Sequence, residues 1–159
     1  MPVEIERKFL VRGDGWKSDH GVRYTQGYLN QDRERTVRVR IAGNRAFLTV
    51  KGINSGAVRA EFEYEIPVSD AEQLLKICEG SLIEKTRHRV DYTGMIWEVD
   101  EFHGANEGLV VAEIELKDAA QTFAMPVWIG LEVTADARYF NSNLAVRPYA
   151  SWLNSESTA

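Results

Sequence analysis

Apolar and charged residues alternate with a period of two from the start of the chain, which is typical of a β-strand with two different faces. In the segment Val3–Val11, Glu4, Glu6 and Lys8 point to one face, and the other face is apolar except for Arg7. A single strand of this kind is most often the edge of a sheet with its charged face in water. The alternation returns along most of the chain, however, and the repetition needs a different explanation.

The repeated pattern predicts a series of strands joined by short connections. Beyond the first strand, the expected strands lie at residues 22–29, 34–41, 45–51, 57–66, 82–91, 95–102 and 109–117. Turn signals such as Gly43-Asn44 and Gly94 join neighbours, so the strands should pair antiparallel. Such a sheet tends to close because closure removes its exposed edges. We therefore expect an α+β, mainly β fold: a closed eight-stranded antiparallel β-barrel with a few short helices packed outside.

The expected helices are short. Ser69 followed by Glu72 resembles a capping box and predicts a helix that ends near Gly80. Further elements are expected at residues 118–124 (helix), 131–134 (short strand) and 143–153 (helix).

The charged faces of the strands carry both signs, and this mixture indicates which face is inside. If the charged faces were outside, the helices would have no apolar face on which to dock. Burying charges without partners costs several kcal/mol each, so an inward arrangement requires pairing and a highly charged ligand. An outer-membrane barrel is also polar inside, but the first strand carries charges where a signal peptide would be apolar. The sequence therefore predicts a barrel with a charged interior.

Composition limits the partners of this barrel. The chain has 159 residues, and we expect one domain over 1–153 followed by a polar tail at 154–159. The net charge of −5 argues against nucleic acid as the main partner. No apolar run approaches the ~20 residues of a membrane-spanning helix, and the lone Cys78 suggests either a reducing compartment or simple packing in the core. These features predict a cytoplasmic protein with no nucleic-acid or membrane partner.

The motifs on successive strands resemble the CYTH domain, the superfamily of triphosphate tunnel metalloenzymes, from about Val3 to Leu144. The resemblance begins with Glu4-Ile5-Glu6-Arg7-Lys8, the ExExK signature of that family. It continues through Arg38-Val39-Arg40, Thr49-Val50-Lys51, Glu61-Phe62-Glu63, Glu84-Lys85-Thr86-Arg87, Glu98-Val99-Asp100, Glu113-Ile114-Glu115 and the segment Asp136 to Asn141. ExExK alone is a weak pattern, whereas the ordered series is specific. The resemblance implies a β-tunnel open at both ends that acts on a triphosphate with a divalent cation.

The resemblance also implies roles for individual residues. Guanidinium forks and lysines match phosphate oxygens, and the residues expected to bind the substrate are Lys8, Arg38, Arg40, Lys51, Lys85, Arg87 and Arg89. Carboxylate oxygens suit Mg²⁺ or Mn²⁺, and the expected metal ligands are Glu4, Glu6, Asp100, Glu113 and Glu115. Glu61, Glu63 and Glu98 are expected either to hold the basic residues in place or to act directly.

The expected catalytic residues are Lys85 and Tyr28. Basic neighbours on the same strand face and burial both lower the pKa of a lysine, so a partly neutral Lys85 held by Tyr28 could accept a proton from water. The alternative is that Lys85 is a further phosphate ligand and Tyr28 a wall residue.

These expectations favour a metal-dependent hydrolase that cleaves inorganic tripolyphosphate, because the short chain leaves little loop for recognising a base. The alternatives are a class IV adenylyl cyclase, a nucleoside or thiamine triphosphatase, and a non-catalytic module that binds polyphosphate. The apolar outer faces exceed what short helices can cover, so a homodimer is also expected.

Overall fold

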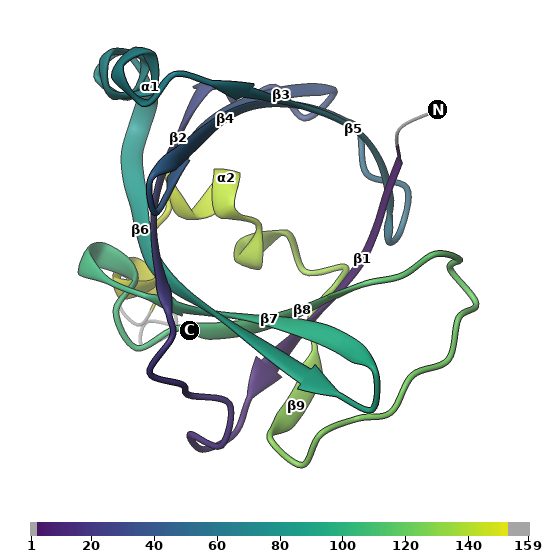
Figure 1. Cartoon of the computed structure of the whole chain (residues 1–159). Coiled ribbons are helices and arrows are strands. Elements are labelled where there is room, and N and C mark those ends of the chain that lie inside the picture. Colours follow the sequence, from purple (N-terminus) through teal and green to yellow (C-terminus); the bar gives the residue numbers. More distant parts are fainter. Residues whose placement is uncertain (1–2, 153–159) are drawn as a thin grey trace.

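The computed structural model describes residues 3–152, and its strands form a closed antiparallel barrel (Figure 1). The strands are β1 (Val3–Val11), β2 (Val22–Asn30), β3 (Arg35–Ala42), β4 (Arg45–Gly52), β5 (Val58–Ile66), β6 (Glu79–Tyr92), β7 (Met95–Phe102), β8 (Val110–Glu115) and β9 (Ile129–Glu132). The order is β5-β4-β3-β2-β6-β7-β8-β1-β9, and an additional pairing of β5 with β1 closes the ring. Among residues 3–152, strands β1 to β8 form the closed ring and β9 pairs only with β1, so the eight-stranded barrel predicted from the sequence is confirmed.

Strand β1 closes the barrel because different parts of it pair with different neighbours. Its middle pairs with β8, where Glu6 lies opposite Glu115 and Lys8 opposite Glu113. Its first residues pair with β5, where Glu4 lies opposite Arg59. Its last residues pair with the short strand β9. The ExExK segment therefore lies at the seam of the barrel.

Helix α1 (Val68–Leu75) packs on the outside of the barrel, as expected, against strands β2, β3 and β4. Ala71 of the helix is buried with Val39 and Ala46 in a small apolar cluster. The predicted capping box is wrong: Pro67 is the N-cap and Ser69 lies within the first turn. Proline suits this position because it has no N–H that would remain unpaired. The helix also ends at Leu75 rather than near Gly80, since β6 already begins at Glu79.

The helix predicted at 118–124 is absent, and the segment forms a turn and an extended loop. The Asp118 carboxylate accepts a hydrogen bond from the Ala120 backbone N–H at 2.8 Å, which favours a turn over a helix. Phe123 then packs edge to face on Phe9 and Trp97. Aromatic packing on the outer face of the barrel thus outweighs helix formation in this loop.

The C-terminal segment differs most from expectation. In place of one helix at 143–153, it forms η2 (Ala137–Tyr139), α2 (Asn141–Leu144) and η3 (Tyr149–Ser151). Pro148 ends any helix that passes through it, since proline disfavours helical backbone at the preceding residue. Residues 153–159, including the predicted polar tail, lie outside the described residues.

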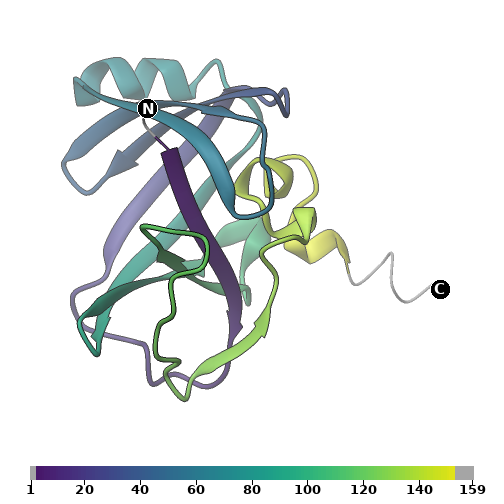
Figure 2. The same ribbon diagram turned by 90° about the vertical axis from the view of Figure 1, so that its right-hand side faces the viewer.

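Helix α2 does not pack outside the barrel. Viewed along the barrel, it lies within the ring (Figure 1), and from the side the segment lies at one end (Figure 2). Leu144, which is 0% exposed, packs there with Tyr28, Ile83 and Phe102. The inner face of the sheet is therefore apolar at this end, and the C-terminal segment occupies an end that the resemblance implied to be open.

No helix in the described part of the chain, residues 3–152, is long and apolar enough to cross a membrane.

Candidate active site inside the barrel

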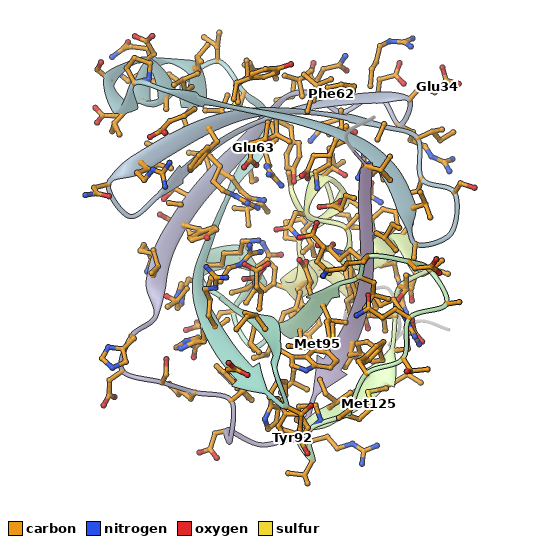
Figure 3. All side chains as sticks on the ribbon, turned by 45° about the vertical axis from the view of Figure 1, so that its right-hand side comes forward. Glu34, Phe62, Glu63, Tyr92, Met95 and Met125 are labelled. Carbon is orange, nitrogen blue, oxygen red and sulfur yellow. The ribbon has the colours of Figure 1, made fainter. Side chains whose placement is uncertain are left out.

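The interior of the barrel encloses a cavity of about 310 Å³ that is lined by residues of all eight barrel strands, β7 contributing Glu98, together with residues of the C-terminal segment. Alternation places the charged side chains inside: Glu63 points into the barrel and its neighbour Phe62 points away (Figure 3). The predicted site residues that line the cavity are Glu4, Glu6, Lys8, Tyr28, Arg38, Arg40, Lys51, Glu61, Glu63, Lys85, Arg87, Glu98, Glu113 and Glu115. The structure thus brings together side chains that are far apart in the sequence.

The most deeply buried part of the site is a group of three charges on β6 and β7. The Asp100 carboxylate accepts from Lys85 Nζ at 2.7 Å, from Arg87 Nε at 2.7 Å and from Arg87 NH2 at 2.9 Å. Lys85 and Asp100 are each 1% exposed. Burial alone would raise the pKa of Asp100, but the charges of Arg87 and Lys85 outweigh it and lower that pKa. Asp100 is therefore a fixed anion between two cations.

Lys85 is held with a lowered pKa. Burial disfavours its charged form, and the nearby Arg87 and Arg40 disfavour it further, so its pKa falls to about 7 despite the attraction of Asp100. Lys85 Nζ also donates to Asn141 Oδ1 at 2.9 Å. A buried lysine that is partly neutral near pH 7 can accept a proton.

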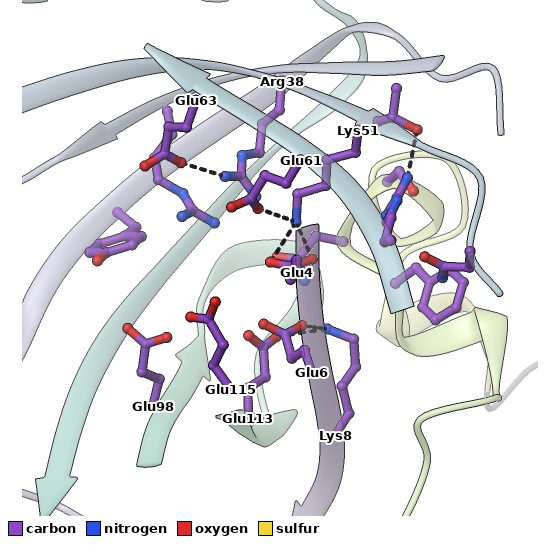
Figure 4. Close-up of a pocket in the computed structure, with 18 of the residues that line it drawn as sticks. Glu4, Glu6, Lys8, Arg38, Lys51, Glu61, Glu63, Glu98, Glu113 and Glu115 are labelled. Atoms are coloured by element: carbon purple, nitrogen blue, oxygen red, sulfur yellow. Dashed lines mark hydrogen bonds and ion pairs between the residues drawn. The ribbon is translucent and has the colours of Figure 1, made fainter. Parts of the chain in front are cut away.

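The second part of the site is a wall of carboxylates on β1, β5 and β8 (Figure 4). Lys8 Nζ donates to Glu6 Oε1 at 3.0 Å and to Glu113 Oε1 at 2.8 Å. Burial and the charge of Glu113 raise the pKa of Glu6 to about 8. Burial together with the charges of Glu4 and Glu98 likewise raises the pKa of Glu115. The carboxyl groups of this wall therefore outnumber Lys8 and Lys51, the lysines that pair with them, and this crowding disfavours the charged forms of Glu6 and Glu115.

The same wall fits a divalent cation by the chemistry of its donors. Hard oxygen donors suit Mg²⁺ and Mn²⁺, and Mg²⁺ is usually held by one or two carboxylates together with substrate phosphates and water. Within residues 3–152, no three or more acidic, histidine or cysteine side chains are already arranged as a metal cluster. The donor set therefore fits a cation that also takes ligands from a substrate.

The third part of the site is a cationic wall on β3 and β4. Arg38 Nε is buried without a hydrogen-bond partner among residues 3–152. Arg40 donates from Nε to Gln26 Oε1 at 2.7 Å and stacks on Tyr24. Burial and the like charges of Arg38 and Arg87 lower the pKa of Arg40 to about 10. Crowded guanidinium groups with unused donors are a site for an anion.

Three predicted residues lie differently from expectation. Arg89 is exposed and does not line the cavity, because it lies beyond Arg87 toward the end of β6. Asp100 is buried behind the cavity wall. The Tyr28 hydroxyl accepts a hydrogen bond from Gln26 Nε2 at 3.3 Å, whereas Lys85 Nζ donates to Asp100 and Asn141.

Sequence reasoning missed Tyr24, Gln26 and Asn141 as members of the site. Tyr24 and Gln26 share the inward parity of Tyr28 on β2, so strand alternation could have identified these two. Asn141 lies on the C-terminal segment, outside the strands, so the alternation of strand side chains could not identify it.

The geometry agrees with comparisons to known proteins. Residues 2–149 match the CYTH domain. A protein named inorganic triphosphatase from Acetivibrio thermocellus is 52% identical over 154 residues, covering 96% of this chain and 99% of that protein. A second inorganic triphosphatase, from Nitrosomonas europaea, is 40% identical over 148 residues, covering 91% and 97%.

Solved structures agree as well. The crystal structure of the inorganic triphosphatase NE1496 has a TM-score of 0.66 at 39% identity and covers 92% of this chain and 96% of that chain. HpAC1 from Hippeastrum, with a TM-score of 0.53 at 14% identity over 74% of this chain and 80% of its own, shares the fold alone.

The burial of Asp100 generates a stability prediction. Asp100→Asn leaves Lys85 and Arg87 without their anion, and removing one partner of a buried ion pair typically costs about 3–5 kcal/mol. The free energy of unfolding, measured by urea denaturation at pH 7, should fall by about that amount. Glu98→Gln is the control, because Glu98 is half-buried and lies 3.3 Å from Arg87 NH1; it should cost less than about 1 kcal/mol. An equal loss of unfolding free energy in the two variants would contradict the claim that the buried ion pairs of Asp100 stabilise the site more than Glu98 does.

Proposed function

This chain belongs to the CYTH domain family, and we propose that it hydrolyses inorganic triphosphate to pyrophosphate and phosphate inside the barrel. The observation that carries the proposal is that the carboxylate wall and the cationic wall line the same cavity, and that each wall would be stabilised by a binding partner of the opposite charge. Arg38 Nε is buried without a hydrogen-bond partner among residues 3–152, and burial with like charges lowers the pKa of Arg40, so an anion would stabilise both groups. Burial and neighbouring carboxylates raise the pKa values of Glu6 and Glu115, and a cation would stabilise the charged forms of both. A polyphosphate with a bound divalent cation supplies both missing partners. The names of the two relatives support the same reaction.

The phosphate chain binds along the cationic wall. Arg38, Arg40 and Arg87 provide guanidinium forks, and Lys8 and Lys51 provide point charges beside the carboxylates. The interactions of Lys51 with Glu4 at 3.0 Å and Glu61 at 3.3 Å fix the lysine before a substrate arrives. Fixed donors of this kind need no reorganisation during the reaction. In this proposal Glu61 and Glu63 orient cations and do not bind phosphate themselves.

Mg²⁺ or Mn²⁺ would be held by Glu4, Glu6, Glu113 and Glu115. When bound, the cation offsets charge on the phosphate oxygens and makes bound water more acidic. Asp100 was also expected as a ligand, but its two oxygens already accept three bonds from Lys85 and Arg87. We therefore assign Asp100 to orienting these two side chains.

Lys85 acts as the general base. Its neutral amine accepts a proton from a water molecule, the water oxygen bonds to a terminal phosphorus, and the bond from that phosphorus to the bridging oxygen breaks. Pyrophosphate then leaves with the electron pair of that bond. The pKa of about 7 makes the neutral form available near neutral pH.

The first test is an assay of the purified protein with tripolyphosphate, ATP or thiamine triphosphate. Phosphate release from tripolyphosphate should require Mg²⁺ or Mn²⁺ and stop in excess chelator, because no cation then offsets the charge on the phosphate oxygens during the reaction. Glu115→Gln should lower turnover at limiting metal by at least about tenfold while the circular dichroism spectrum is unchanged. Full hydrolysis in chelator would refute the metal role, and cyclic AMP from ATP would favour a cyclase.

The second test is the pH dependence of turnover. Because only neutral Lys85 accepts a proton and its pKa is about 7, kcat should rise with pH through that value and level off above it. Lys85→Arg keeps the positive charge but cannot lose its proton near neutral pH. The Lys85→Arg variant should have an unchanged KM, and its kcat should be lower by about 100-fold or more. If Lys85 is only a phosphate ligand, the arginine variant will turn over almost normally and Lys85→Ala will weaken binding instead.

We also propose that the chain forms a homodimer through the outer face of β5. Phe62 and Tyr64 on this face are 38% and 60% exposed, and Val3 of the adjoining β1 is 44% exposed. Light scattering should give twice the 18.0 kDa mass of the chain. In the Tyr64→Glu variant the measured mass should fall to that of one chain, because dimer formation would bury the new carboxylate in the interface. A mass of one chain for the unaltered protein would remove the proposal.

A further inference from the structure

Asn141, at the start of helix α2, places an amide inside the barrel beside the reaction centre. The residue comes from the C-terminal segment, whereas the other groups around Lys85 come from barrel strands. We infer that Asn141 is a positioning residue whose amide oxygen holds Lys85 Nζ in the direction from which it accepts a proton from water. This inference rests on the proposed function of Lys85.

A chain of hydrogen bonds fixes which atom of the Asn141 amide faces Lys85. Arg40 can only donate, so its bond from Nε to Gln26 Oε1 at 2.7 Å identifies that atom of Gln26 as the oxygen. The Gln26 Nε2 group must then donate, and it lies 3.1 Å from Asn141 Oδ1. Gln26 is 0% exposed, so water cannot offer it another arrangement. Asn141 Oδ1 is therefore an acceptor, and Lys85 Nζ donates to it at 2.9 Å.

Two acceptors match the hydrogens of a neutral lysine. A neutral amine has two N–H hydrogens and one lone pair. Asp100 Oδ2 at 2.7 Å takes one hydrogen, and Asn141 Oδ1 takes the other. The lone pair is then left over, and Lys85 lines the cavity in which the substrate would bind. Without Asn141, Asp100 alone would hold Lys85 Nζ, so the atom could move away from its present position and the lone pair would lose a fixed direction.

The packing of the C-terminal segment holds Asn141 in place. Leu144, in the same short helix, is 0% exposed within the apolar cluster at this end of the barrel. The Leu144 backbone N–H donates to Phe140 O at 3.0 Å, and Asn143 Nδ2 donates to Ala137 O at 2.6 Å. The segment that occupies the end of the barrel therefore also completes the surroundings of the proposed base.

The test is a double-mutant cycle between Asn141 and Lys85, read by steady-state kinetics on tripolyphosphate with Mg²⁺. Asn141→Leu keeps the approximate size of the side chain and removes the acceptor. It should lower kcat by about 10- to 100-fold, the scale for a misplaced catalytic group, and leave KM within about threefold because Arg38, Arg40 and Arg87 remain. In a Lys85→Ala background, Asn141→Leu should lower kcat no further, since residues that act as a unit are not additive.

The matched control is Val146→Leu on the same segment, which changes a side chain that is 65% exposed and outside the cavity; its kcat should be unchanged. Thermal unfolding of every variant checks the fold, and Asn141→Ala replaces Asn141→Leu if leucine prevents folding. Unchanged kcat in the folded Asn141 variants, or an equal further loss in the Lys85→Ala background, would overturn the inference.

A crystal structure of the Asn141 variant separates this inference from the proposed function. Lys85 Nζ should leave its position between Asp100 Oδ2 and residue 141 whether or not the protein cleaves tripolyphosphate. If the unaltered protein has no triphosphatase activity, the proposed function fails, and the position of Lys85 in the variant still decides whether Asn141 orients it. An unmoved Lys85 Nζ would contradict the positioning role.

Discussion

The buried contact of Asp100 with Lys85 and Arg87 is the interaction on which the rest of the site depends. One carboxylate holds two cations from the neighbouring strand, with three hydrogen bonds of 2.7 to 2.9 Å. Burial and the charges of Arg87 and Arg40 lower the pKa of Lys85 to about 7, although Asp100 attracts its charged form. The contact with Asp100 therefore keeps Arg87 charged for phosphate and holds Lys85 in place, while burial and the neighbouring guanidinium groups make Lys85 able to lose its proton.

Barrel closure makes this arrangement possible. Strand β1 carries Glu4 and Glu6 to the seam, where they lie opposite Arg59 on β5 and Glu115 on β8. An open sheet would expose these charges to water, and their pKa values would return toward ordinary ones. At one end the inner face becomes apolar and the C-terminal segment packs on it, so charge is concentrated in the remaining length of the barrel.

Strand alternation predicted the barrel, its charged interior and most of the site, because the direction of a side chain on a strand follows from its position alone. Glu63 inside and Phe62 outside illustrate this rule. Alternation could not show how far along the barrel a residue lies, so Arg89 was wrongly placed in the cavity. It also gave no information about residues 137–152, whose short helices depend on packing against the barrel; Asn141 was missed for that reason. The cytoplasmic location stays a prediction.

The central claim is that the two charged walls and Lys85 form one site for triphosphate. A crystal structure of the protein with tripolyphosphate in excess chelator, where turnover should be blocked, tests it most directly. The account predicts phosphate oxygens on Arg38 Nε and on Arg40, with Lys85 Nζ facing a terminal phosphorus and still bonded to Asp100. Tripolyphosphate bound outside the barrel, or inside it with Lys85 Nζ turned away from the phosphate chain, would contradict the account.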